Sequence, residues 1–228
     1  PVIASIAKEL GALTVAVVTK PFKFEGKKRI AAAEKGLAGL VEEVDSLVTI
    51  PNEKLLEILG PDTPISDAFA KSDDVLKGAV QGISDIIMQR GHVNVDFADV
   101  RAVMSEKGTA MMGTGIATGK NRAEVAGNMA VKSELLDDIN LKNARGVLVN
   151  ITGKSPTLGD QTEVTNIVEE IVSEDALVIY GLVFDDSYKD DIKVTIVATG
   201  VDQRAPTLAI DNEPSMTLNP VGLNRNRT

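Results

Sequence analysis

The amino-acid sequence predicts an α/β unit followed by an α+β domain, with one long helix between them. Helical and strand-like patterns alternate over residues 1–50, which is typical of α/β proteins. Residues 65–155 contain no proline, and a long helical pattern occupies the start of this stretch. Hydrophobic residues make up 43% of the 228-residue chain and charged residues 25%, so there is enough apolar surface to form a folded core.

The first unit begins with a helical pattern. Apolar residues recur at helical spacing over residues 2–10, and Pro1 suits the first position of a helix. Residues 13–19 are apolar on both faces, as in a strand inside a parallel sheet. A second helical pattern covers residues 30–41, and residues 46–50 form a second short strand. Because the unit starts with a helix and shows only two strands, it is predicted to be the back half of a doubly wound sheet.

The long helix is predicted to connect two domains. Its apolar positions run from Val75 to Ile87, and it is expected to close at Gly91. A helix of about 20 residues is roughly 30 Å long, the width of a domain. The second half has helical patterns at 96–104, 122–131 and 163–172 and strands at 109–116, 146–152, 177–184 and 192–199. The last two strands are predicted to be adjacent in a four-stranded sheet, because their polar link is short enough for a hairpin.

These patterns divide the chain into four parts: a partial first domain (residues 1–65), a connecting helix (66–91), an α+β domain (92–200) and a tail (201–228). The tail contains prolines and asparagines but no aromatic residue, and we expect it to be disordered. At roughly 150 residues per domain the length corresponds to about one and a half domains. Since the first residue is Pro1 rather than Met, we expect the sequence to be a fragment.

Composition excludes several classes of function. The net charge of −9 repels a phosphate backbone, which argues against nucleic acid as a partner. No apolar run approaches the 18 or so residues of a membrane span, so direct membrane insertion is not expected. The chain has no cysteine and one histidine, so disulfides and thiolate metal sites are excluded and no metal ligand is assigned. Any catalysis must use carboxylates, amides and the backbone.

Asn94, Asp96 and Asp99 lie between the long helix and the next one. The two carboxylates are three residues apart, so they share one face at a helix start. As structural residues, Asp96 caps the helix and Asp99 favours the positive end of its dipole. As functional residues, the three side chains project together at a domain edge, where they are suited to orienting a water or a cation beside phosphates.

Two further groups follow the predicted strands, where doubly wound sheets bind ligands. Glu25 and Arg29 either form an exposed ion pair or contact a ribose hydroxyl and a phosphate. Asn52 either starts a helix at Glu53 or donates to a base or ribose. Phe69 and Asp74 flank the start of the long helix. They are either a buried ring and a first-turn acid, or a ring and a carboxylate that contact a purine.

A glycine-rich segment, GTGIATGK at residues 113–120, is superficially similar to a phosphate-binding loop. Its spacing differs from that of a P-loop, and Asn121 stands where the required hydroxyl residue is expected. We therefore predict a strand end and a turn.

The order of these motifs resembles FtsZ, the family of tubulin-like bacterial cell-division GTPases, from Pro1 to about Val201. The segments that carry the resemblance are TVAVVTKPFKFEGKKR, SLVTIPNEKLL, DAFAKSDDVLKGAVQGI, NVDFADVRAVM, GTAMMGTGIATGKNRAEVA, ARGVLVNITG and KVTIVATG. The resemblance implies a partial GTP-binding domain, a central helix and a tubulin-like C-terminal domain. It also implies head-to-tail filaments in the division ring at mid-cell, in the cytoplasm.

The resemblance also implies a role for each candidate residue. Glu25, Arg29 and Asn52 match contacts to the nucleotide, Phe69 matches the ring against guanine, and Asp74 matches the carboxylate that selects it. The implied ligands are GTP and GDP, with Mg²⁺ accompanying the nucleotide. The catalytic set, Asn94, Asp96 and Asp99, matches the family's synergy loop, which completes the site of the neighbouring subunit.

The 228 residues depart from the family pattern, because they contain no GGGTGTG phosphate loop, which the family has just before the segment that matches Pro1. The resemblance therefore implies a GTPase in the intact protein, whereas the fragment alone is expected to be inactive. Division-ring regulators and membrane tethers are implied partners of the intact protein, but the usual C-terminal tethering peptide is not recognisable in residues 218–228. Two alternatives remain: a tubulin-like structural polymer without catalysis, and an unrelated α/β enzyme that binds a small molecule at Glu25 and Arg29.

Overall fold

The computed structural model describes residues 1–88, 96–106, 109–133, 135–136 and 141–201. The helices are α1 (Val2–Glu9), α2 (Lys27–Val41), α3 (Asn52–Leu59), α4 (Ile65–Met88), α5 (Phe97–Met104), α6 (Arg122–Val131) and α7 (Leu158–Glu169). The strands are β1 (Val15–Lys20), β2 (Ser46–Pro51), β3 (Thr109–Ala117), β4 (Gly146–Gly153), β5 (Leu177–Phe184) and β6 (Ile192–Val201). The residues predicted to end the long helix, and the predicted tail from residue 202, lie outside the described residues.

The strands form a six-stranded mixed sheet with the order β1-β2-β3-β6-β4-β5. β1 and β2 are parallel, as the alternating pattern at the start of the sequence predicted. β6 runs antiparallel between β3 and β4, and β4 pairs in parallel with β5. β2 and β3 pair at only two positions, Leu47 with Thr109 and Val48 with Ala110. The short β2–β3 pairing thus connects the two parallel strands of the first unit to the four strands predicted for the second.

The prediction that the last two strands are neighbours is wrong. β6 lies between β3 and β4, whereas β5 pairs with β4 alone and forms the edge of the sheet. Residues 185–191 therefore carry the chain past β4, a distance of roughly 10 Å that seven residues span easily. Every residue of β6 is buried, whereas β5 has residues that are exposed at both ends. The strand whose residues are all buried thus takes the position with a partner on both sides.

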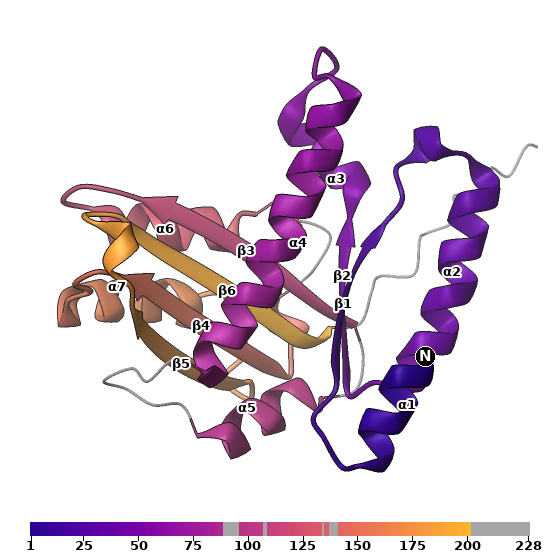
Figure 1. Cartoon of the computed structure of the whole chain (residues 1–228). Coiled ribbons are helices and arrows are strands. Elements are labelled where there is room, and N and C mark those ends of the chain that lie inside the picture. Colours follow the sequence, from indigo (N-terminus) through magenta and orange to yellow (C-terminus); the bar gives the residue numbers. More distant parts are fainter. Residues whose placement is uncertain (89–95, 107–108, 134, 137–140, 202–228) are drawn as a thin grey trace, which may run out of the picture.

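Helices cover both faces of the four-stranded part of the sheet. α4 crosses one face, and α6 and α7 lie on the opposite face (Figure 1). One core cluster combines Ala79, Ile83 and Ile86 of α4 with residues of β4 and β6. A second cluster combines alanines of α6 with Val164 and Val168 of α7. The long helix predicted from the proline-free stretch is therefore confirmed, with 24 residues from Ile65 to Met88.

The glycine-rich segment is a strand end followed by a turn, as predicted. β3 ends at Ala117, and Gly119 has a φ of 91°, a conformation that favours glycine. Gly113 and Gly115 lie in the strand beneath α6, where an added Cβ atom would collide with the carbonyl oxygens of Ala130 and Ala126 respectively. The glycines of β3 therefore serve the close packing of a helix on a strand.

Candidate functional site

The segments that follow β1 and β2 leave the sheet at the same end. Lys20 lies opposite Pro51 in the parallel pairing, so the carboxyl ends of the two strands are level. This end of the sheet lies next to the first turn of α3 (Figure 1). It carries Glu25 and Arg29 after β1 and Asn52 after β2. The arrangement matches the place where open α/β sheets bind ligands.

Glu25 and Arg29 form an ion pair between neighbouring turns. The Arg29 Nη1 atom lies 3.0 Å from Glu25 Oε2, and the Arg29 side chain is 71% exposed whereas that of Glu25 is 11% exposed. The other carboxylate oxygen of Glu25 accepts the backbone N–H of Phe22 at 2.9 Å. Glu25 is thus held rigidly by two bonds, while Arg29 keeps most of its guanidinium open to a ligand.

Three phenylalanine rings pack together beside this pair. Phe22 is fully buried and stacks on Phe24, with ring centroids 4.8 Å apart. Phe69 of α4 meets Phe22 edge-on at 5.3 Å and Phe24 edge-on at 6.0 Å. Phe24 and Phe69 remain 51% and 40% exposed, so the buried-ring interpretation of Phe69 is wrong. The cluster fixes the Phe69 ring and still leaves part of it accessible to a planar ligand.

Asn52 is not a helix cap. It is the first residue of α3, the N-cap position belongs to Pro51, and no side chain caps this helix. The Asn52 side chain is instead buried, and its Oδ1 atom accepts a hydrogen bond of 2.8 Å from the Ser72 hydroxyl of α4. The capping interpretation of Asn52 is therefore wrong.

Glu53 connects the two strand ends directly. One of its carboxylate oxygens accepts the backbone N–H of Lys23 at 2.9 Å, and the other lies 3.9 Å from the Lys23 ammonium. The contacts of Glu53, Ser72 and Phe22 thereby connect three segments: the loop after β1, the start of α3 and the second turn of α4. Sequence reasoning missed these supporting residues, because none of them stands out from the periodic pattern around it.

Asp74 lies further along α4. Since α4 begins at Ile65, Phe69 and Asp74 lie inside the helix, and the acidic residue of the first turn is Asp67. The interpretation of Asp74 as a first-turn acid is therefore wrong. Asp74 is exposed, and no hydrogen-bond or ion-pair partner for its carboxylate is found within the described residues. Its carboxylate remains free to accept hydrogen bonds from a ligand.

Asp96 and Asp99 lie at the first turn of α5, and both are exposed. The Asp96 Oδ1 atom accepts the backbone N–H of Ala98 at 3.1 Å, which confirms the predicted cap. The rest of α5 is anchored, because Val103 is buried and its carbonyl accepts a 2.8 Å hydrogen bond from Thr199. In the described ranges no group of three or more His, Cys, Asp and Glu side chains is placed to hold a metal ion. Asn94, the third predicted catalytic residue, lies outside the described residues.

The two groups of candidate residues lie at opposite ends of the molecule. Figure 1 places the ends of β1 and β2 near the top of the view and α5 at the bottom, with α4 running between the two ends. The 24 residues of α4 correspond to about 36 Å. The acidic turn of α5 therefore does not reach a ligand held at Glu25 and Asn52 of the same chain.

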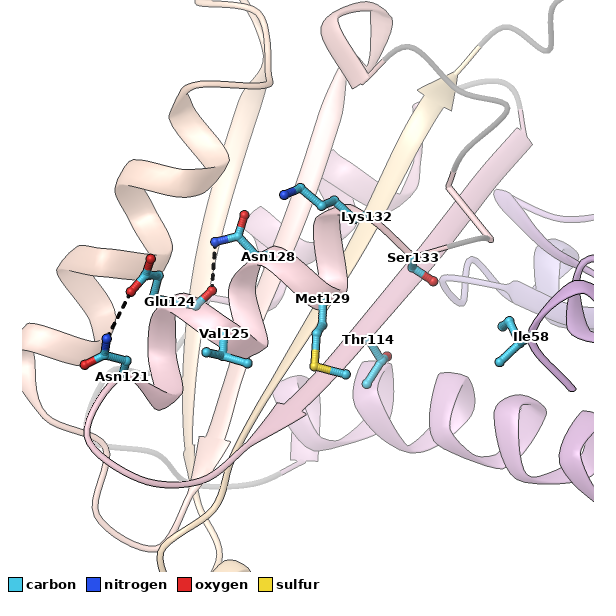
Figure 2. A pocket seen from close by; sticks show the side chains of 9 residues that line it. All are labelled: Ile58, Thr114, Asn121, Glu124, Val125, Asn128, Met129, Lys132 and Ser133. Atoms are coloured by element: carbon cyan, nitrogen blue, oxygen red, sulfur yellow. Dashed lines mark hydrogen bonds between the residues drawn. The ribbon is translucent and has the colours of Figure 1, made fainter.

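A separate open hollow of about 720 Å³ lies along one side of α6 (Figure 2). Its lining residues are Ile58, Thr114, Asn121, Glu124, Val125, Asn128, Met129, Lys132 and Ser133. The Asn128 amide donates to the Glu124 carbonyl at 2.9 Å, so polar groups of this helix face are bonded to each other. None of the residues predicted to bind or act on a ligand lines this hollow.

Two family models match the sequence in succession. The model of the tubulin/FtsZ family GTPase domain matches residues 1–60, and the model of the FtsZ family C-terminal domain matches residues 108–202. The "Cell division protein FtsZ" of Azotobacter vinelandii is 56% identical over 225 residues, which cover 97% of this chain and 56% of that protein. The chain thus spans little more than half the length of its curated relatives.

Solved structures agree with the sequence matches. An "FtsZ dimer, empty" from M. jannaschii superposes with a TM-score of 0.83 at 42% identity, covering 89% of this chain and 58% of that one. CetZ1 from Haloferax volcanii, a GDP-bound monomer, superposes with a TM-score of 0.71 at 18% identity and covers 89% of this chain and 60% of that one. The second likeness shows the fold alone.

Proposed function

Because this chain belongs to the FtsZ family, we propose that it forms part of a filament-forming GTPase of cell division, which binds guanine nucleotide at the ends of β1 and β2. Membership of the family removes the alternative of an unrelated α/β enzyme. The observation that carries the proposal is the separation of the two groups: the segments after β1 and β2, with Glu25, Arg29 and Asn52, lie at one end of the molecule, and the start of α5, with Asp96 and Asp99, lies at the other.

At the first end, each side chain has a chemically suitable task. Glu25 accepts from a ribose hydroxyl, and the exposed guanidinium of Arg29 pairs with a phosphate or the base. Asn52 donates to the base or ribose. The accessible part of the Phe69 ring packs against guanine, and the exposed carboxylate of Asp74 accepts the N–H groups that distinguish guanine from adenine.

At the second end, Asp96 and Asp99 act on the nucleotide of the next subunit. Phosphoryl transfer depends mainly on positioning and charge stabilisation, and two exposed carboxylates on an anchored turn are suited to hold the attacking water and the cation that accompanies the nucleotide. Asn94 completes this set. The substrate is GTP with Mg²⁺, and the products are GDP and phosphate.

A contact between unlike ends of identical subunits does not close on itself, so it generates a filament. The M. jannaschii relative described as an FtsZ dimer supports self-association of this kind. We place the filament in the cytoplasm at the mid-cell division ring, where regulators and membrane tethers are its further partners. No helix in the described part of the chain is long and apolar enough to cross a membrane.

Taken alone, the 228 residues are proposed not to turn over GTP, because they contain no loop of backbone N–H groups recognisable as a phosphate cradle. Purified chain mixed with GTP should release phosphate no faster than a buffer control. Added to the full-length protein, it should bind the nucleotide end of a filament through its α5 turn and reduce filament mass in light scattering. Measurable phosphate release would contradict the statement that the chain alone is inactive. An unchanged scattering signal would contradict the statement that it binds the end of a filament.

A mixing experiment with the full-length protein tests the division of labour between the two ends. Asp99→Ala should lower GTP turnover by about 100-fold or more and leave nucleotide affinity unchanged, because its effect is on the neighbour. Asp74→Ala should abolish guanine binding in its own subunit. Mixed in equal amounts, the two inactive variants should regain part of the turnover, because some junctions then combine an intact nucleotide end with an intact α5 turn.

Asp175 is an exposed acidic residue in the turn before β5. The matched control is the variant Asp175→Ala, which should hydrolyse GTP at the normal rate. If the mixture stays inactive although filaments form, the hydrolysis site is not shared between subunits. If the unmutated protein forms filaments and never releases phosphate, the non-catalytic structural polymer is the correct assignment.

A further inference from the structure

The described structure contains a buried polar contact between two helices at the proposed nucleotide end. Asn52 at the start of α3 is 4% exposed and Ser72 of α4 is 3% exposed. The Ser72 hydroxyl donates to the Asn52 Oδ1 atom at 2.8 Å. We propose that Ser72 is a positioning residue, which holds the Asn52 amide in the orientation that contacts the nucleotide. The inference rests on the proposed function, since it concerns how the same site is built.

The hydrogen bond decides which end of the amide faces the ligand. An asparagine side chain presents an oxygen acceptor or an NH₂ donor depending on how its amide is turned, and its partners select one of the two. Because Oδ1 accepts the hydrogen bond from Ser72, the Nδ2 group of Asn52 points away from Ser72. Among the described residues nothing accepts from Nδ2, and this group is not sealed from solvent. Asn52 is thus prepared to donate to an oxygen or ring nitrogen of the base or ribose.

The same turn of α4 also presents the aromatic surface. Phe69 precedes Ser72 by three residues, so the two side chains lie on one face of the helix. The Phe69 ring is held in turn by Phe22 and Phe24 from the loop after β1. The Ser72–Asn52 bond therefore fixes the spacing between the ring and the amide donor. A ligand that packs on Phe69 and accepts from Asn52 finds both groups already in place, which lowers the cost of ordering them on binding.

Removing the Ser72 hydroxyl has a predictable consequence. In Ser72→Ala the Asn52 Oδ1 atom is left buried without a donor, a state that proteins avoid by rotating the group or admitting water. Either response gives up the fixed orientation of Nδ2. The loss should appear in nucleotide affinity, whereas a hydroxyl that only joins two helices would affect stability and leave affinity unchanged.

The test is a double-mutant cycle in the full-length protein, with the Kd of a fluorescent GDP as the readout. Asn52→Ala should raise Kd about tenfold, the effect of one lost hydrogen bond to a ligand. Ser72→Ala should raise it by about three- to tenfold, and the double variant should bind no more weakly than Asn52→Ala. Ser72→Thr retains the hydroxyl and should restore most of the affinity. Ser66 is an exposed serine of the same helix whose hydroxyl donates to Asp67, so Ser66→Ala is the control and should bind normally.

Each other result contradicts a specific part of the inference. If Asn52→Ala weakens binding and Ser72→Ala lowers only the urea midpoint, Ser72 is structural and the proposed nucleotide site stands. If the two effects on Kd multiply in the double variant, Ser72 acts independently of Asn52 and the positioning role is wrong. If the unmutated protein binds no guanine nucleotide, the proposed function itself fails, and the inference fails with it.

Discussion

In β4 and β6 every residue is buried, whereas α1 and α2, in the first unit, bury none of theirs. The two regions do not differ in the quality of their sequence patterns. Val2, Ile3 and Ile6 of α1 and the following Leu10 form a regular apolar stripe, and yet they are 73%, 84%, 52% and 81% exposed. A periodic pattern therefore predicts that a helix exists, and it does not say what covers the helix.

Because the packing is unequal, the residues that stabilise the fold are largely different from the candidate ligand residues. One core cluster combines α6 and α7 with one face of the second-half strands, and the other combines α4 with the opposite face and extends into the first unit through Val48, Ile50 and Leu55. The proposed nucleotide residues lie at the margin of this core, where side chains such as Arg29 and Phe69 remain exposed. We expect substitutions in the two core clusters to act on folding and those of the proposed nucleotide residues to act on binding.

The largest effect is expected for Gly115→Ala. An added Cβ atom would collide with the carbonyl oxygen of Ala126 and approach Met129 Cβ to 2.7 Å, so α6 must move away from β3. Overpacking of this kind costs about 3 kcal/mol or more of unfolding free energy. Urea denaturation followed by circular dichroism measures the loss. An unchanged midpoint would mean that α6 does not pack on β3 as closely as described.

The next effect is expected for Arg122→Met, which removes an ion pair between α6 and α7. The Arg122 Nη2 atom lies 2.7 Å from Asp160 Oδ2 and 2.9 Å from the carbonyl oxygen of Ser155, and Nη1 donates to the carbonyl of Asp190 at 3.1 Å. The side chains of the pair are only 17% and 11% exposed. The substitution should lower the unfolding free energy at neutral pH by about 2 kcal/mol. The matched control is Lys154→Met: its 3.9 Å pair with Asp186 is largely exposed, and about 0.5 kcal/mol or less should be lost.

The Arg122 effect should depend on pH. Partial burial raises the pKa of Asp160, but the hydrogen bonds from Arg122 and Thr157 outweigh it and hold the pKa below its ordinary value. A lowered pKa in the folded state stabilises the protein above the unfolded pKa, about 3.9 for aspartate, and this contribution is lost as the pH falls through the folded value. The difference between wild type and Arg122→Met should therefore be constant from pH 5 to 7 and shrink below about pH 4.

Much of the fold can be predicted from local patterns, because the spacing of apolar residues in a segment reflects which of its side chains are buried. The apolar run of β2 and the proline-free run of α4 identified both elements, and the glycine spacing at residues 113–120 correctly indicated a turn. The order of β5 and β6 did not follow, because a seven-residue link is compatible with both a hairpin and a passage across one strand. Which strand lies in the middle is decided by packing on both faces, which no short window of sequence contains.

The candidate site was predictable to a similar extent. The position of Glu25 and Asn52 after parallel strands placed them at one edge of the sheet, and the Glu25–Arg29 ion pair followed from their spacing, although only its Arg29 side is exposed. The burial of Asn52 did not follow, because its partner Ser72 lies 20 residues away on another helix. Serine in a helix carries no signal of its own. Supporting contacts of this kind are set by tertiary structure and are visible only there.

A smaller effect, with the opposite sign, is expected for Gly36→Ala in the first unit. Gly36 lies inside α2, and an added Cβ atom meets nothing within 4 Å. Alanine reduces the freedom of the unfolded chain and favours the helix by about 0.5–1 kcal/mol. The urea midpoint should therefore rise, in contrast to the fall expected for Gly115→Ala. A decrease would show that α2 packs against another part of the protein at this position.

The smallest effect is expected for Ile3→Ser on α1. The Ile3 side chain is 84% exposed, so its removal takes almost no apolar surface out of a core, and the unfolding free energy of the 228-residue chain should change by less than about 0.5 kcal/mol. Val149→Ser in β4, where the side chain is fully buried, is the matched comparison and should cost several times more. A loss above about 1 kcal/mol for Ile3→Ser would mean that the stripe on α1 is covered in solution, by another copy of the chain if the loss grows with protein concentration. A loss independent of concentration would place α1 against the rest of its own chain, and the contrast between the two regions would then be smaller than the exposed areas indicate.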